Sequence, residues 1–149
     1  MTSLTVVRRI AARPSIVFDA LTTPEGIIHW WGPDDGPTLI AETELRVGGR
    51  FRVRFRELNG NEHETQGQYL EFLKPKRLVM SWRWLGGDVD PGESRVEIDL
   101  RAIPEGTELT VTHSALFNEE SRLSHEQGWH GALDKLARHL QTITTERAS

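Results

Sequence analysis

Between residues 38 and 113 the chain alternates apolar and polar side chains with a period of two, and turn signals separate successive runs. This alternation is typical of β-strands that bury one face and expose the other. The Asn59-Gly60 pair stands between two such runs and is a strong hairpin signal. Because tight turns join antiparallel strands, the pattern predicts an antiparallel sheet with one apolar face.

A sheet with one apolar face needs a cover, and one long helix at the end of the chain is predicted to supply it. Apolar residues between about 118 and 142 recur at alternating steps of four and three, which places them on one face of a helix. That face comprises Trp129, Leu133, Leu136, Leu140 and Ile143.

Two short helices, over residues 12–21 and 23–31, are expected between a first strand over 4–10 and the rest of the sheet. Each has a proline near its start, where the missing N–H costs nothing. The second helix is predicted to end at Trp30 and Trp31, because a Gly-Pro pair follows and stops it.

Two irregular features are expected within the sheet. Tyr69 and Phe72 are an odd number of residues apart, so a β-bulge near Leu70 and Glu71 is needed to keep both rings on one face. The acidic, glycine-rich segment 86–92 predicts a long loop between two strands.

A chain of 149 residues is expected to form one domain, with residues 144–149 as a frayed polar tail. The absence of cysteine excludes disulfides and thiol catalysis and suits a reducing cytoplasm, where we expect the protein to be located. The net charge of −4 argues against nucleic acid as a partner. No apolar run approaches the roughly 20 residues that cross a membrane, so no membrane association is expected.

One basic run stands out. Arg50, Arg52, Arg54 and Arg56 alternate with apolar residues, which indicates the solvent-facing side of a strand. We favour this interpretation over a phosphate-binding stripe.

The other polar clusters predict no metal or cofactor site. His125 and His130 are five residues apart on the last helix and do not converge on one ion. Asp34 and Asp35 are expected in a solvated loop, and His63 is expected to be exposed.

Five tryptophans can either fill a core or line a pocket, since indole is large and carries one N–H. Both alternatives stay open for Trp82 and for Trp129, which begins the apolar face of the last helix. Adjacent helical residues point about 100° apart, so one of Trp30 and Trp31 is predicted to lie at the wall or mouth of a pocket. Trp84 shares a strand face with Trp82.

His113 is in phase with the apolar residues of the last strand, so its ring is expected to point inward. An inward polar group needs a hydrogen-bond partner. It is either a structural histidine bonded to the C-terminal helix or a polar contact and general base at a pocket wall.

Gly128 and Gly131 flank Trp129 in the last helix, where each costs about 1 kcal/mol relative to alanine. They indicate either close packing against neighbouring elements or room for a ligand beside Trp129.

Several short segments appear in a recognisable order along nearly the whole chain. They are ALTTPE at 20–25 with WWGP at 30–33, GGRF at 48–51, GQYLE at 67–71 leading into RLVMSW at 77–82, TELTVTH at 107–113, and GW at 128–129 with LDKL at 133–136. Together they resemble the helix-grip fold of the START-like (SRPBCC) superfamily. Within it, the chain resembles the bacterial homologues of the activator of the heat-shock-protein-90 ATPase, and specifically its C-terminal domain.

The resemblance implies an α+β fold, in which a curved antiparallel sheet of about seven strands wraps around a long C-terminal helix. Two short helices follow the first strand, and an internal cavity lies between the sheet and the long helix. Members of the superfamily use this cavity for lipids, hormones, or polyketide and other aromatic intermediates, and a few are cyclases or hydrolases. START-like domains are often monomers or homodimers.

Three functions follow as hypotheses. The first is binding of a small hydrophobic or aromatic molecule in the cavity. The second is a polyketide-cyclase-like enzyme in which His113 acts as acid or base, and the third is a chaperone or stress-response interaction module. The predicted ligand-binding residues are Trp30, Trp31, Phe55, Tyr69, Trp82, Trp84, His113, Trp129 and Leu133.

Overall fold

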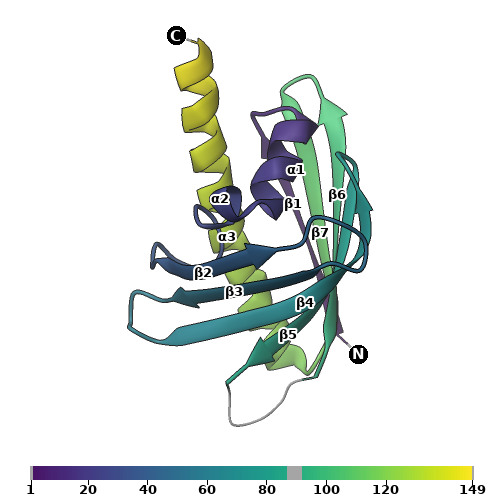
Figure 1. The fold of residues 1–149 in the computed structure, drawn as a ribbon, viewed down its shortest axis with the longest axis vertical. Coiled ribbons are helices and arrows are strands. Elements are labelled where there is room, and N and C mark those ends of the chain that lie inside the picture. The colour runs from purple at the N-terminus through teal and green to yellow at the C-terminus, as the bar shows by residue number, and fades with distance from the viewer. Residues whose placement is uncertain (1, 87–91, 149) are drawn as a thin grey trace.

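The computed structural model describes residues 2–86 and 92–148, with side chains up to residue 141 (Figure 1). In these residues the chain forms one antiparallel sheet in the order β1-β7-β6-β5-β4-β3-β2, so the predicted α+β helix-grip fold is confirmed. In chain order the elements are β1 (Thr2–Ile10), α1 (Pro14–Thr22), α2 (Pro24–Ile27), β2 (Thr38–Thr43), β3 (Arg50–Arg56), β4 (Glu62–Leu73), β5 (Arg77–Leu85), β6 (Ser94–Ile103), β7 (Gly106–Leu116) and α3 (Glu119–Ala148).

The sheet curves around α3. In Figure 1, β2, β3 and β4 cross in front of the helix, whereas β1 and β7 run beside it. The contacts agree with this view, because α3 packs mainly along β1, with further contacts to β7 and α1. The helix is therefore close to one half of the sheet and farther from the other.

Two features that the sequence predicts within the sheet, a hairpin and a β-bulge, are present in the structure. β3 and β4 form the predicted hairpin, in which Gly60 adopts a φ of 93°. The register of β4 on β5 shifts between Tyr69 and Glu71, which confirms the predicted bulge. The rings of Tyr69 and Phe72 consequently meet at a centroid distance of 5.4 Å.

The second helix is shorter than expected. α2 ends at Ile27, and turns continue the chain to Trp30, so the prediction of a helix up to Trp31 is wrong. The amides of Trp30 and Trp31 both donate to the Ile27 carbonyl, at 3.2 and 3.1 Å. The last turn therefore tightens and ends the helix rather than extending it.

The side of α3 that faces β1 and β7 packs an aliphatic core. Leu133, Leu136 and Leu140 on the helix are fully buried, as are Leu109 and Val111 on β7. At the edge of this core, Arg8 on β1 forms an ion pair with Asp134 on α3. Burial of these aliphatic side chains holds the helix onto this half of the sheet.

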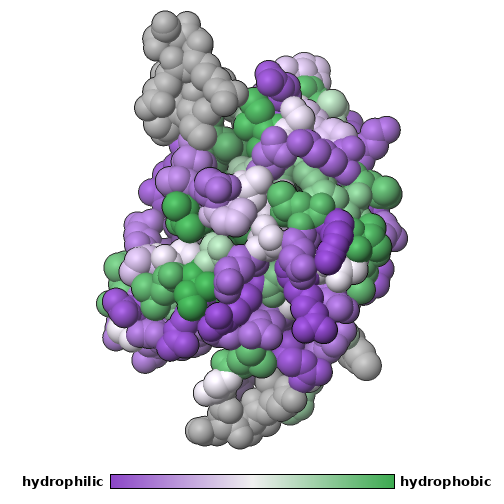
Figure 2. All heavy atoms as spheres, in the orientation of Figure 1, coloured by the Kyte–Doolittle hydropathy of each residue, from purple (hydrophilic) through white to green (hydrophobic). Residues whose placement is uncertain are grey.

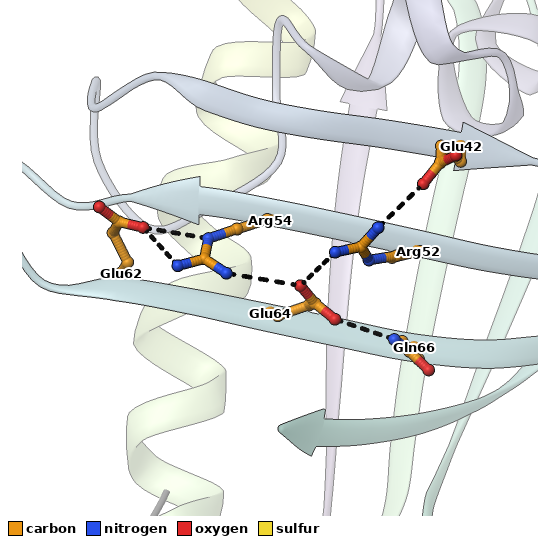
Figure 3. A network of polar contacts seen from close by, with 6 residues as sticks. All are labelled: Glu42, Arg52, Arg54, Glu62, Glu64 and Gln66. Atoms are coloured by element: carbon orange, nitrogen blue, oxygen red, sulfur yellow. Dashed lines mark hydrogen bonds and ion pairs between the residues drawn. The ribbon is translucent and has the colours of Figure 1, made fainter. Parts of the chain in front are cut away.

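The opposite, outer face of β2–β4 carries the arginine run as a network of charged pairs (Figure 3). Arg52 donates to Glu42 at 3.3 Å and to Glu64 at 3.1 Å, and Arg54 donates to Glu62 at 2.7 Å. Glutamates thus neutralise much of this positive charge, as expected for the wet face of a strand. Figure 2 shows hydrophilic and apolar patches interspersed on this side of the molecule.

Some expectations concern parts of the chain that are only partly described. Residues 87–91, which make up most of the predicted acidic loop, lie outside the described residues. The frayed tail over 144–149 stays a prediction. Among the described residues, no helix is both long and apolar enough to span a membrane.

Candidate functional site

A pocket of about 620 Å³ lies between the inner face of the sheet and α3. Its walls come from the segment after α2, from β3, β4 and β5, and from the first half of α3. The exposed side chains of Ser124 and Gln127 stand at its rim, so it opens to solvent and is not the enclosed cavity that the family resemblance implied. Its volume falls within the roughly 300–1,000 Å³ typical of small-molecule sites.

The structure brings most of the predicted site residues together and leaves three outside the pocket lining. Tyr69, His113 and Leu133 are buried but do not line it. Tyr69 packs behind the wall on Phe51, and Leu133 belongs to the aliphatic core. The predicted residues that do line the pocket are Trp30, Trp31, Phe55, Trp82, Trp84 and Trp129.

Trp30 and Trp31 are both buried, with 1% and 4% of their surface exposed. Both line the pocket, whereas one of them was expected at its wall or mouth. The argument that adjacent helical residues cannot both be buried does not apply, because both residues lie beyond the end of α2. Trp30 turns back toward α1, where its Nε1 donates to the carbonyl of Ala20 at 2.8 Å. Trp31 stacks on Trp82 with ring centroids 5.0 Å apart and planes at 10°.

The indole N–H groups around the pocket differ in how they are satisfied. Trp84 Nε1 donates to His125 Nε2 at 2.8 Å, and Trp129 Nε1 donates to His113 Nδ1 at 3.1 Å. Trp82 Nε1, by contrast, is buried and has no acceptor among the described residues. An unpaired buried donor costs about 1–3 kcal/mol. Because this Nε1 atom has no exposed surface, an acceptor on a ligand would reach it, and recover part of that cost, only after the Trp82 ring or a neighbouring ring shifts.

His113 points inward, as predicted, and both of its ring nitrogens are engaged. Nδ1 accepts from Trp129, which leaves Nε2 to donate to the Ser94 hydroxyl at 2.8 Å. Burial, together with the nearby His125 ring, lowers the pKa of His113 to about 3. A neutral imidazole that is bonded on both sides and lies outside the pocket lining matches the structural alternative rather than a general base.

His125 holds the second tethered indole. Its Nδ1 donates to the Ser121 carbonyl at 2.7 Å, so its Nε2 is the acceptor for Trp84. Burial lowers the pKa of His125, and the hydrogen bond to Ser121 opposes this only in part. Two neutral histidines therefore fix the orientation of two indoles, one on β5 and one on α3.

A carboxylate–imidazole pair stands at the pocket and was not predicted. Glu57, in the turn after β3, lies with its Oε2 at 2.6 Å from Nε2 of His63 on β4. Both residues line the pocket. The His63 side chain retains 41% of its accessible surface, in line with the expected exposure, but it also contributes to the pocket wall. His63 also packs against Phe55, its partner across the hairpin, at a ring distance of 5.3 Å.

The two glycines of α3 have different surroundings. A Cβ on Gly131 would lie 2.1 Å from the carbonyl oxygen of Pro33, so this glycine permits close packing of α3 on the segment after α2. A Cβ on Gly128 would meet no atom within 4 Å, and Gly128 lines the pocket. Each of the two sequence-based explanations therefore applies to one glycine.

Buried polar contacts hold the segment after α2 in place. Lys135 on α3 donates through Nζ to the carbonyls of Trp31 at 2.9 Å and Asp34 at 2.6 Å, and burial lowers its pKa. The Asp34 carboxylate accepts from the amides of Gly36 at 2.9 Å and Leu58 at 3.1 Å. The expectation that Asp34 lies in a merely solvated loop is wrong, because it joins this segment to the β3–β4 turn.

The family described as Activator of Hsp90 ATPase homolog 1-like protein matches residues 11–141. The chain belongs to this family. In sequence, no curated protein matches the chain.

Solved structures of several bacterial proteins share the fold of this chain. An AHSA1 protein from Silicibacter pomeroyi is 25% identical over 95% of this chain and 99% of its own, with a TM-score of 0.84. A protein from Chromobacterium violaceum is 24% identical over 91% and 94%, also with a TM-score of 0.84. An AHSA1-like protein from Aeromonas hydrophila is 22% identical over 96% and 94%, with a TM-score of 0.79.

Sequence reasoning missed two features of the site in this family member, although signals for one were present. Glu57 continues the inward parity of Phe55, and the Asn-Gly hairpin register places His63 opposite Phe55. Applied together, these signals would have placed both residues on the inner face. Lys135, in contrast, looks like any exposed helix lysine, and its carbonyl partners lie about a hundred residues away in sequence.

Proposed function

We propose that this protein binds a small, mostly apolar aromatic molecule that carries a hydrogen-bond acceptor. The observation that carries the proposal is the pocket wall of stacked indoles in which Trp82 Nε1 has no acceptor among the described residues. Flat rings favour a flat ligand, because offset stacking adds to the area that is buried. The unpaired N–H favours a ligand with a carbonyl or similar oxygen at its inner end, which would reach the covered Nε1 atom through a small shift of the Trp82 ring.

The supporting geometry is pre-formed rather than adaptable. Trp84 and Trp129 are held by His125 and His113, and Trp31 is stacked on Trp82. A wall that is already ordered loses little side-chain entropy when a ligand binds, which favours affinity. Because no cysteine is present, a reducing cytoplasmic location remains part of this proposal.

A tryptophan-fluorescence titration with two matched probes tests the acceptor. Acetophenone and ethylbenzene are similar in size, but only the former carries a carbonyl. We expect the wild type to bind acetophenone about fivefold more tightly, and Trp82→Phe to remove that preference by deleting one N–H. Trp84→Phe is the matched control, because its N–H is already bonded to His125 and its loss leaves the preference intact. No fluorescence response to either probe would overturn the proposal.

A second role has support from the family description, which names an activator of the Hsp90 ATPase. A chaperone-linked or stress-response function would use an outer surface of the same domain, as a monomer or homodimer. Co-purification of the tagged protein with the host chaperone tests it, and variants that fill the pocket should leave that association unchanged. The geometry of His113, bonded on both sides, gives the cyclase hypothesis no comparable support.

A further inference from the structure

The charge of the pocket wall is uneven. Among the residues that line the pocket, Glu57 is the one that carries a formal charge from a carboxylate, ammonium or guanidinium group. The outer-face arginines Arg52 and Arg54 point away from the pocket and are paired with glutamates (Figure 3). Lys135 is turned toward backbone carbonyls and is not part of the lining. The described lining therefore presents one carboxylate and no ammonium or guanidinium group, and the group that contacts this carboxylate is the imidazole of His63.

The carboxylate stands beside a corner made of aromatic rings. The rings of Phe55 and Trp84 lie 6.0 Å apart with their planes at 68°, so they form two walls that face different directions. His63 completes the corner, with its ring 6.1 Å from that of Trp84 and at 75° to it. Glu57 is fixed at this corner by its contact with His63.

A second carboxylate, that of Asp34, lies near the same turn but outside the pocket lining, and the ammonium of Lys135 partly balances its charge. Asp34 accepts from the amide of Leu58, the residue that follows Glu57. The Glu57 side chain retains 24% of its accessible surface, so an approaching group can still reach it. Aromatic faces attract cations through the ring quadrupole, and a nearby carboxylate attracts them through its charge. Anionic ligands, in contrast, would have to lose water beside the carboxylate of Glu57.

We infer that the ligand of this pocket is an organic cation, an aromatic ammonium compound whose charged nitrogen lies between the Phe55–Trp84 corner and the carboxylate of Glu57. This inference rests on the proposed function, because it assigns the chemical class of the molecule bound in the same pocket. The apolar part of such a ligand stacks along the Trp31 and Trp82 rings, and the cationic part stays near the pocket mouth.

Two isosteric probes test the charge directly. Phenyltrimethylammonium and tert-butylbenzene have nearly the same shape but differ in one positive charge. We expect the wild type to bind the cation at least as tightly as the neutral probe, measured by tryptophan fluorescence at low ionic strength. Glu57→Gln should weaken binding of the cation by about 5- to 30-fold and leave the affinity for the neutral probe unchanged.

Glu62→Gln is the matched control, because it removes the same charge from the outer face, where Glu62 pairs with Arg54. It should change neither affinity by more than about twofold, since exposed charges are screened. Trp84→Leu removes one aromatic wall of the corner. It should lower the affinity for the cation more than the affinity for the neutral probe.

The outcomes separate this inference from the proposed function. Tight binding of tert-butylbenzene with weak binding of the cation would overturn the inference and leave the proposed function standing. An equal effect of Glu57→Gln on both probes, or an equal effect of Glu57→Gln and Glu62→Gln on the cation, would also overturn it. Binding of neither probe would overturn the inference, and if acetophenone also failed to bind, the proposed function would be overturned as well.

Discussion

The two halves of the sheet meet the same helix in different ways. Along β1 and β7, α3 contributes leucines such as Leu136 to an aliphatic core that is fully buried. Opposite β3, β4 and β5, the helix contributes Trp129 and His125 to a wall of rings around an open volume. Aliphatic side chains with branched, compact shapes fill space, whereas flat rings held by hydrogen bonds can border it.

The comparison teaches that one helix can stabilise the fold and shape a site without conflict. The aliphatic half supplies the free energy that keeps α3 on the sheet. The aromatic half can then leave a pocket open, because its rings are fixed by polar tethers at His113 and His125 and by mutual stacking.

Truncation of one side chain in each half should lower the free energy of unfolding by different amounts. Leu136→Ala removes a fully buried side chain and should lower the free energy of unfolding by about 2–5 kcal/mol, with probe affinity unchanged in the folded fraction. Trp84→Ala removes a larger but half-buried side chain that borders the pocket and should cost less. Urea denaturation of both variants measures these losses in the free energy of unfolding. A greater loss for Trp84→Ala would contradict the division into two halves.

Lowering the pH should reduce the free energy of unfolding, chiefly because His113 is buried in the aromatic half of the interior. Its folded-state pKa of about 3 lies below the ordinary 6.5, so the unfolded chain binds a proton that the folded chain does not. Stability is therefore complete above about pH 6.5 and should fall by up to about 1.4 kcal/mol per pH unit as the pH drops toward 3. Urea titrations at several pH values should show this slope, and His113→Gln should reduce it. The residual slope would come from His125 and His139, whose pKa values burial also lowers, and at lower pH from carboxylates such as Glu64, whose pKa the hydrogen bond from Arg52 lowers. An unchanged slope in His113→Gln would contradict the assignment.

Gly131→Ala should disturb the junction between α3 and the segment after α2. Its methyl group would lie 2.1 Å from the Pro33 carbonyl oxygen, so backbone must shift. We expect a loss of about 1–3 kcal/mol in thermal or urea denaturation, despite the better helix propensity of alanine. A stabilised variant would show that the contact is not tight.

Gly128→Leu gives the smallest change in stability and tests the pocket directly. The added side chain enters open space beside the pocket, and leucine favours the helix by up to about 1 kcal/mol relative to glycine. We expect unchanged or slightly raised stability together with weaker binding of both aromatic probes, measured by fluorescence titration. Full retention of binding would show that ligands do not approach this part of α3.

Much of the fold could be predicted because its signals are local. The Asn59-Gly60 turn sets the β3–β4 register, and the parity slip between Tyr69 and Phe72 locates the bulge. The predicted end of α2 was a few residues too late. Where this helix ends depends on the hydrogen bond between the Trp30 side chain and the carbonyl of Ala20 in α1, and this contact between two elements is not visible in the local sequence.

The site was less predictable, because a pocket depends on the distance between elements rather than on the residues within one. The sequence placed Trp82 and Trp129 on facing elements, yet both a filled core and an open wall were consistent with it. The partner of His113 on the C-terminal helix was one of the expected alternatives, and the structure identifies it as Trp129.

The contact of Lys135 with the carbonyls of Trp31 and Asp34 also limits how a molecule can enter. If the segment after α2 moved away, the buried ammonium of Lys135 would lose both of its acceptors, which is costly. This side of the pocket opening should therefore stay in place. The hydrogen bond from the Leu58 amide to Asp34 ties the β3–β4 turn to the same segment. Access should instead depend on the initial turns of α3, where Ser124 and Gln127 are exposed.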